Sequence, residues 1–201
     1  MSSVNHTDPT VLSTIANRWS PYRYSDRQVE DATLRSCFEA ARWAASSYND
    51  QPWYWIVFRK EEQGFESLVR CLMEANQSWA QKSPILILSV LRTSFAHNGQ
   101  PNRVASHDLG QATAFLSLQA CEIGLQVHQM GGINLSAARQ SFQIPEGFEP
   151  YTAIALGYPR EAPAESEQDK LLEKREMASR QRRPLSKTVF INAWGQPSEN
   201  F

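Results

Sequence analysis

Two groups of arginine residues at opposite ends of the chain have the chemistry to hold an anion. Arg18-Trp19-Ser20 lies near the N-terminus, and Arg180-Gln181-Arg182-Arg183-Pro184 lies near the C-terminus. Planar guanidinium groups beside a hydroxyl suit a phosphate monoester, because bidentate charge-assisted hydrogen bonds satisfy its oxygens. Either group alone is more often a solvated surface, since most arginines are exposed. A single phosphate site that uses both groups requires a fold that brings the two ends of the chain together.

A polar loop supplies a second kind of binding chemistry. Ser46 to Trp53 follows an apolar helical run, and Ser46, Ser47 and Asn49 each offer groups that donate or accept hydrogen bonds. Such a loop suits a flat heteroaromatic ligand edged with carbonyls and ring nitrogens, although Ser, Asn and Asp are also ordinary turn residues. Together with the arginines and the Gly131-Gly132 turn, the loop indicates a nucleotide pocket.

The histidines and cysteines do not have the spacing of a metal site or a catalytic triad. The four histidines lack HxxxH or HExxH spacing, and the three cysteines lack a CxxC pair, which favours free thiols in a reducing compartment. A Rossmann fingerprint, a Walker loop and a Ser-His-Asp order are also absent. Only His128, next to the glycine turn, is a weak candidate for donating a hydrogen bond or a proton.

Length and charge favour one domain with a small-molecule partner. The chain has 201 residues, a formal net charge of -1 and a pI of about 6.4, which give no electrostatic footprint for nucleic acid or an anionic membrane. Its first thirty residues lack the apolar core of a secretory signal, and the longest apolar run, Pro84 to Leu91, is too short to cross a bilayer. We therefore expect a single domain over residues 1–201 in the cytoplasm.

Hydrophobic periodicity predicts helices interleaved with strands. A first helix is expected to begin at the Thr7-Asp8-Pro9 cap and to end near Arg18. Other helices are expected at residues 29–44, 65–73, 107–123 and 135–142, and strands at 55–58, 85–91, 125–128 and 152–157. Residues 93–103 lack periodicity and form a loop. This order lacks a regular βαβ period and favours an α+β layered fold.

The C-terminal fifth of the chain has the composition of an arm. Residues 161–180 are charged and polar, and they are followed by the strand-like segment Thr188 to Asn192. A strand at the end of a charged arm would fit as an edge strand on the sheet of a partner subunit. We expect residues 161–201 to form this arm.

The order and spacing of these pieces resemble the nitroreductase family of FMN-dependent oxidoreductases over nearly the full chain. The similar segments are Arg18 to Pro21 (the opening Arg-x-Ser element), Glu39 to Trp53 (the hallmark loop), Gly110 to Leu125 (the dimer-forming helix), His128 to Gly132 (the loop beside the flavin), Ile144-Pro145-Glu146, Ala155 to Pro159 and the closing Arg-Arg-Pro-Leu. The resemblance implies a three-layer α-β-α fold with a mixed, largely antiparallel central sheet and an arm exchanged with the partner subunit.

The resemblance also implies a homodimer with two FMN sites at its interface, each built from both subunits. Arg18 and Ser20 would hold the phosphate with Arg180 and Arg182; Ser46, Ser47 and Asn49 would line the ring and ribityl chain near Gln51; and Asn76 would face the pyrimidine edge. Met130, Gly131 and Gly132 would present backbone groups to the reactive N5 and O4 atoms. Trp19 and Tyr22 complete the expected set.

The activity implied by this resemblance is hydride transfer from NADH or NADPH through FMN to a nitroaromatic, a quinone or a similar acceptor, in ping-pong order. The protein would supply positioning and electrostatics rather than a nucleophile, acid or base. Alternatives are another flavin reaction on the same fold, such as dehalogenation, dehydrogenation or flavin fragmentation, and a flavin-binding protein without significant turnover.

Two positions depart from the family pattern. Ala45 stands where family members usually have a proline before the Ser-Ser pair. Tyr22 stands where many relatives carry an arginine or lysine that faces the flavin N1/O2 edge, and Arg23 follows one place later. Either Arg23 takes over that role through a shifted turn, or the reduced flavin is less stabilised.

Overall fold

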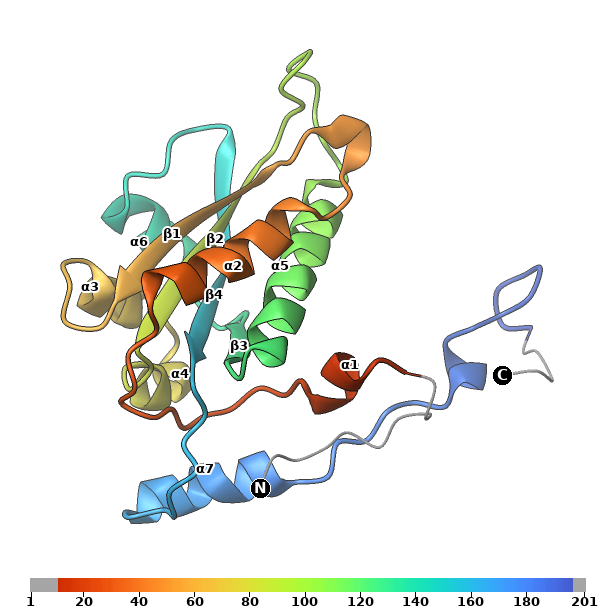
Figure 1. Ribbon diagram of the computed structural model, residues 1–201. Coiled ribbons are helices and arrows are strands. Elements are labelled where there is room, and N and C mark those ends of the chain that lie inside the picture. Colours follow the sequence, from red (N-terminus) through yellow and green to blue (C-terminus); the bar gives the residue numbers. More distant parts are fainter. Residues whose placement is uncertain (1–10, 197–201) are drawn as a thin grey trace.

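The computed structural model describes residues 11–196 (Figure 1). The helices are α1 (Ser13–Asn17), α2 (Asp31–Arg42), α3 (Phe65–Cys71), α4 (Glu74–Ala80), α5 (Ala105–Glu122), α6 (Leu135–Ser141) and α7 (Glu167–Met177). The strands are β1 (Trp53–Arg59), β2 (Ile85–Arg92), β3 (Gln126–Met130) and β4 (Phe148–Gly157). Two short 3-10 turns, η1 (Ser47–Asn49) and η2 (Leu185–Lys187), lie in the loop after α2 and in the tail.

One antiparallel sheet occupies the middle of the molecule. Its strand order is β1-β2-β4-β3, so the apolar strand β2 lies inside and β1 and β3 form the edges. The largely antiparallel sheet expected from the sequence is confirmed. All pairings between these four strands are antiparallel, so the parallel component of the expected mixed sheet is absent from the described chain.

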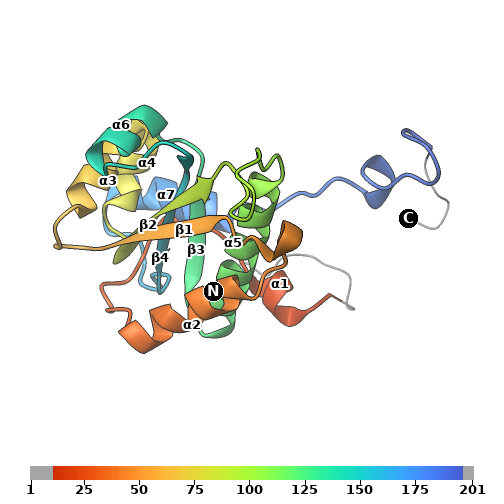
Figure 2. The ribbon, with the colours of Figure 1, turned by 90° about the horizontal axis from the view of Figure 1, so that it is seen from above.

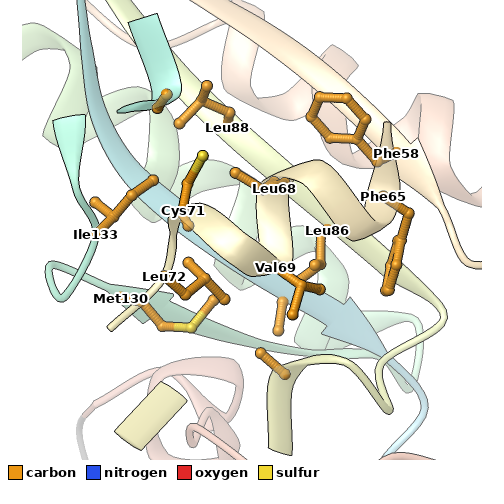
Figure 3. Close-up of a cluster of buried hydrophobic side chains, with 14 of the residues drawn as sticks. Phe58, Phe65, Leu68, Val69, Cys71, Leu72, Leu86, Leu88, Met130 and Ile133 are labelled. Carbon is orange, nitrogen blue, oxygen red and sulfur yellow. The ribbon is translucent and has the colours of Figure 1, made fainter. Parts of the chain in front are cut away.

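Helices cover both faces of this sheet and create two hydrophobic cores. Alternation along β2 sends Leu86 and Leu88 to one face and Ile85 and Ile87 to the other. The first face packs against α3, α4 and α6, where Trp79 is buried in the same cluster as Phe65 and Leu68. Figure 3 shows Phe65 and Leu68 in this core. The second face packs against α2 and α5. The expected three-layer α-β-α arrangement is therefore confirmed, and Figure 2 shows the two helical layers on either side of the sheet.

The longest helix of the described chain, α5, is apolar around most of its circumference. One face is buried against β2 and α2, whereas Gly110, Ala114 and Phe115 on another face are exposed. Phe115 retains 42% of its side-chain exposure. Within residues 11–196, no helix combines the length and the hydropathy needed to cross a membrane.

Most predicted elements form, but the region around Asn76 was read incorrectly. No helix was expected between residues 73 and 85, yet α4 occupies Glu74–Ala80. Its sequence is mostly polar and only Trp79 and Ala80 are buried, so it has too few apolar residues to show a helical period. The expected first helix is reduced to Ser13–Asn17, and the Thr7-Asp8-Pro9 cap lies outside the described residues.

The predicted arm divides into a docked helix and an outward segment. Two buried carboxylates attach α7 to its own chain: Asp169 accepts a hydrogen bond from Lys82, and Glu176 accepts bonds from the backbone of Tyr22 and Arg23. After Met177 the chain runs away from the sheet in both views. In place of the strand expected at Thr188–Asn192, this tail holds η2 and a turn closed by Ile191. Its pairing with a partner's sheet remains a prediction.

Candidate functional site

The arginines predicted to bind phosphate come together from the two ends of the chain. Trp19 is buried, and its backbone N–H donates to Gln126 Oε1 at 3.1 Å. The guanidinium carbon of Arg180 lies 5.7 Å from the centre of the Trp19 ring, at the outer range of a cation–π contact. Burial lowers the pKa of Arg180, and the positive charges of Arg18 and Arg182 lower it further. A concentration of positive charge is therefore built within one chain.

Tyr22 belongs to a stack of rings at the end of the sheet. Its ring meets Trp79 edge-on at 5.2 Å and His128 at 4.8 Å, and the centres of Trp79 and His128 lie 4.4 Å apart. His128 Nδ1 lies 2.8 Å from the carbonyl oxygen of Pro21. Burial lowers the pKa of His128, against the opposing effects of that carbonyl and of the Glu176 charge. His128 thus has a structural role that sequence reasoning did not foresee.

Arg23, which follows Tyr22 in the chain, is paired with acidic residues of its own chain. It is 8% exposed, its Nε donates to Glu176 Oε2 at 2.8 Å, and its Nη2 lies 3.0 Å from Glu173 Oε1. Its charge is therefore neutralised by two carboxylates of α7. A different cation lies over Tyr22, because the guanidinium carbon of Arg175 is 5.8 Å from the centre of that ring.

The glycine turn and Asn76 form a close contact beside this stack. Asn76 Nδ2 donates to the carbonyl oxygen of Gly132 at 3.1 Å, and the Met73 N–H donates to the same oxygen at 2.9 Å. A Cβ on Gly132 would lie 2.7 Å from Asn76 Nδ2, which is too close. Gly132 is thus required for this approach, whereas Met130 is the last residue of β3 and is buried in the core. Gly131 is exposed.

The loop of Ser46 to Gln51 forms a separate tip. Tyr48, Asn49 and Gln51 have φ values of 54°, 54° and 50°, a left-handed conformation that costs non-glycine residues energy. Ser46 Oγ accepts a hydrogen bond from the Gln51 N–H at 3.0 Å, and the Ser47 N–H donates to Asp108 at 3.0 Å. Strain of this kind persists only where surrounding contacts hold it, and it clusters at functional sites.

Asp50 provides the main anchor of the tip. Its carboxylate accepts hydrogen bonds from Arg92 Nη2 at 3.0 Å and from the Ala96 N–H at 2.8 Å, and its side chain is 2% exposed. Burial alone would raise the pKa of Asp50, but the Ala96 N–H and the Arg92 charge hold it below its ordinary value. Asp50 therefore ties the tip to the loop after β2.

The structure divides the predicted site residues into two groups. The sheet-end group contains Arg18, Trp19, Tyr22, Asn76, Met130, Gly131, Gly132, Arg180 and Arg182, with Ser20 included from its position in the chain, whereas the tip group contains Ser46, Ser47, Asn49 and Gln51. Asp108 near the start of α5 holds the tip, and Glu122 at its end accepts a bond from Thr14. Fourteen residues of helix separate these two anchors by about 21 Å.

The register of the strands gives an independent estimate of the distance between the sheet-end group and the tip group. Met130 lies level with Ala153, Leu88 and Ile56 across the four strands. Three strand spacings put it about 14 Å from β1, and the start of β1 is a further ~10 Å along that strand. Met130 and Trp53, which border the glycine turn and the tip, are therefore roughly 17 Å apart in one chain.

Sequence reasoning missed the charged residues that hold the two groups in place. These are Asp50 with Arg92, Asp108 beneath Ser47, and Arg23 with Glu173 and Glu176. Asp108 was detectable as a carboxylate in the first turn of a mostly apolar helix. Within residues 11–196, no group of three or more His, Cys, Asp or Glu side chains has the arrangement of a metal site.

Comparisons with known proteins identify the family to which the chain is similar. The family model "Nitroreductase family" matches residues 15–158. A protein of Methanothermobacter thermautotrophicus named "Putative NADH dehydrogenase/NAD(P)H nitroreductase" is 28% identical over 159 residues, which cover 76% of this chain and 79% of that protein.

Two solved structures share the fold over most of their length. One, titled "The crystal structure of the oxidoreductase containing FMN", has a TM-score of 0.84 and 28% identity and covers 96% of both chains. A nitroreductase family protein from Clostridium difficile 630 has a TM-score of 0.66 and 27% identity, covering 88% of this chain and 94% of that one. The chain therefore belongs to the nitroreductase family of oxidoreductases.

Proposed function

We propose that this protein is an FMN-dependent oxidoreductase that passes electrons from NADH or NADPH to a nitroaromatic, a quinone or a similar acceptor. The observation that carries the proposal is the meeting of Arg18, Trp19 and Arg180, which brings charge from both ends of the chain to one place. The names of the relatives support NAD(P)H and FMN as the redox partners.

The donor groups fit the different parts of FMN. Arg18, Arg180 and Arg182 match a dianionic phosphate, because guanidinium groups bind its oxygens with charge-assisted hydrogen bonds. The backbone of the Gly131-Gly132 turn and the amide of Asn76, which the Gly132 carbonyl holds beside it, match the polar edge of the isoalloxazine ring. Because a side chain at position 132 would meet Asn76, only glycine there lets the turn lie against that amide. Ser46, Ser47 and Asn49 would complete the site along the ring and ribityl chain.

The separation of the two groups supports a homodimer. A flavin ring that contacts both the glycine turn and the tip cannot take both from one chain, because Met130 and Trp53, which border them, are roughly 17 Å apart. A two-fold axis would bring the tip of one subunit to the sheet end of the other. The exposed face of α5, with Gly110, Ala114 and Phe115, is a suitable contact surface, and the tail after Met177 would wrap the partner.

In this reading the chain contributes binding and electrostatics. When bound, FMN supplies the redox chemistry, accepting two electrons from the nicotinamide and giving them to the acceptor in a second half-reaction. The arginines fix the phosphate end, and the ring stack of Tyr22, Trp79 and His128 supports the backbone around the flavin. His128 Nδ1 is engaged with Pro21, so no side chain is assigned as an acid or a base.

The visible spectrum and steady-state kinetics test the proposal directly. The purified protein should show flavin absorption bands, and heat-released cofactor should behave as FMN. Oxidation of NADH or NADPH should depend on an added nitroaromatic or quinone, with parallel double-reciprocal lines that indicate a ping-pong order. A protein that binds FMN and yet shows no acceptor-dependent turnover with either nucleotide contradicts the proposal.

A flavin-binding protein without significant turnover is the second candidate. The observation that favours it is Tyr22, because the neighbouring Arg23 is neutralised by Glu173 and Glu176 and does not provide the usual cation. Loss of that cation would lower the reduction potential of the flavin. A midpoint potential well below that of free FMN, together with no turnover, would favour this candidate.

A further inference from the structure

Three aromatic rings are gathered at the outer surface of the tip. Tyr48 is 81% exposed, and its ring centre lies 5.6 Å from Phe95 and 5.4 Å from His97. Phe95 and His97 are themselves 5.4 Å apart. The rings come from two loops, Tyr48 from the turn after α2 and the others from the loop after β2. Exposed aromatic rings that gather in this way mark binding surfaces more often than isolated ones do.

The backbone holds these rings outward at a cost. Tyr48 has a φ of 54°, a conformation that disfavours a bulky side chain. Asp50 fixes both loops at once, because it accepts hydrogen bonds from Arg92 and from the N–H of Ala96, between Phe95 and His97. The planes of Tyr48 and Phe95 are almost perpendicular, at 88°, so these rings meet edge to face instead of stacking in parallel. A ring face of the exposed Tyr48 is therefore available to a flat ligand.

We propose that Tyr48, Phe95 and His97 form the outer wall of the electron-acceptor site and select flat aromatic acceptors. The inference rests on the proposed function, which brings Ser47 and Asn49, the neighbours of Tyr48, to the flavin of the other subunit. An acceptor lying on that flavin would have the Tyr48 ring at its outer side. Each subunit would thus supply the acceptor-binding rings for its partner's cofactor.

Equilibrium binding of two matched acids tests this wall without turnover. Benzoate and cyclohexanecarboxylate have the same charge and similar size, but only benzoate is flat and aromatic. Their dissociation constants can be measured on the oxidised FMN-loaded protein from the change in its visible spectrum. We expect the unmodified protein to prefer benzoate, and each ring to contribute a factor of about 2 to 12 in affinity.

Two substitutions at position 48 separate the effect of the aromatic ring from the effect of the left-handed backbone. Tyr48→Asn removes the ring and keeps a residue that tolerates the left-handed conformation, whereas Tyr48→Phe keeps the ring. Phe95→Leu removes a second ring with little change in volume. Tyr54→Ala is the matched control, because Tyr54 forms a similar edge-to-face pair with Phe148 at 5.1 Å and is 42% exposed, but lies on β1 outside the tip.

Tyr48→Asn and Phe95→Leu should each reduce the preference for benzoate, while Tyr48→Phe and Tyr54→Ala should retain it. In turnover, the ratio of kcat/KM for a nitroaromatic to that for ferricyanide should fall by a similar factor in the first two variants. An unmodified protein that does not prefer benzoate, or a Tyr48→Asn variant that keeps the preference, overturns the proposal. So does dissociation of the dimer by Tyr48→Asn, since the rings would then be interface packing. Absence of bound FMN would instead refute the proposed function.

Discussion

The sheet-end group and the tip group are held in place in opposite ways. At the sheet end, Arg23 and Glu176 are buried with complementary charges, and the rings of Trp79 and His128 join the core. At the tip, three residues with positive φ are exposed, and Asp50 supplies the main anchor. The sheet-end residues therefore stabilise the fold in addition to their proposed role in binding FMN, whereas the tip contributes little to the stability of the fold. Substitutions in the two groups should affect stability and cofactor binding differently.

The largest effect on stability is expected from Glu176→Ala at the sheet end. The change leaves the Arg23 guanidinium buried beside only the half-exposed Glu173 and removes the acceptor of two backbone N–H groups. Breaking a buried pair in this way costs about 3–5 kcal/mol of unfolding free energy. Urea denaturation should show this loss of unfolding free energy. Glu39→Ala, which breaks the fully exposed pair with Arg42, is the control and should have no measurable effect.

Arg18→Ala should release the cofactor without unfolding the chain. Hydrogen bonds to charged groups contribute about 1.5–3 kcal/mol, so FMN affinity should fall roughly 10- to 150-fold. Fluorescence titration of the apoprotein with FMN measures this change. Normal affinity in the variant would remove Arg18 from the phosphate site.

Asp50→Asn should affect the tip alone. The substitution keeps the volume of the side chain but removes the charge that pairs with Arg92 and stabilises the strained loop. We expect roughly a tenfold loss of FMN affinity and a smaller change in unfolding free energy than in Glu176→Ala. If Asp50→Asn destabilised the fold as much as Glu176→Ala, the tip would be as important to the stability of the fold as the sheet end.

The smallest effect expected is a pH dependence from His128. Burial lowers its pKa in the folded state below the ordinary value of about 6.5, so the unfolded chain takes up a proton first as the pH falls. Stability contributed by the neutral imidazole is therefore complete above about pH 7 and is lost progressively below about 6.5. His128→Gln should flatten this slope in thermal unfolding measured from about pH 7 down to about pH 5. An unchanged slope would show that His128 does not cause it.

The fold was predictable because its apolar segments are strongly patterned. The run of Ile85 to Leu91 specified an inner strand, and the period of α5 specified a long packed helix. The polar α4 was missed, since it buries only Trp79 and Ala80. The tail segment was expected as a strand, but a strand forms only beside another strand, and residues 188–192 pair with none of β1 to β4 in the described chain.

The residue types of the candidate site were predictable, but their separation into two distant groups was not. Arg18, Asn49 and Gly132 were chosen from their chemistry and from the family resemblance, which carry no information on distance. The separation of the tip from the glycine turn comes from strand order, which places β1 and β3 at opposite edges. The role of Arg23 also depended on a contact 153 residues away, with Glu176, that local patterns do not reveal.

The central claim, that each cofactor site combines the sheet end of one subunit with the tip of the other, is tested most directly by complementation. Arg18→Ala breaks the sheet end, and the double variant Asn49→Ala/Asp50→Asn breaks the tip. Each should bind FMN weakly alone. After the two are unfolded and refolded together, mixed dimers should contain one intact site and regain tight FMN binding in a fluorescence titration. Folded mixed dimers that regain no tight binding would show that both groups must come from the same chain, and would contradict the account.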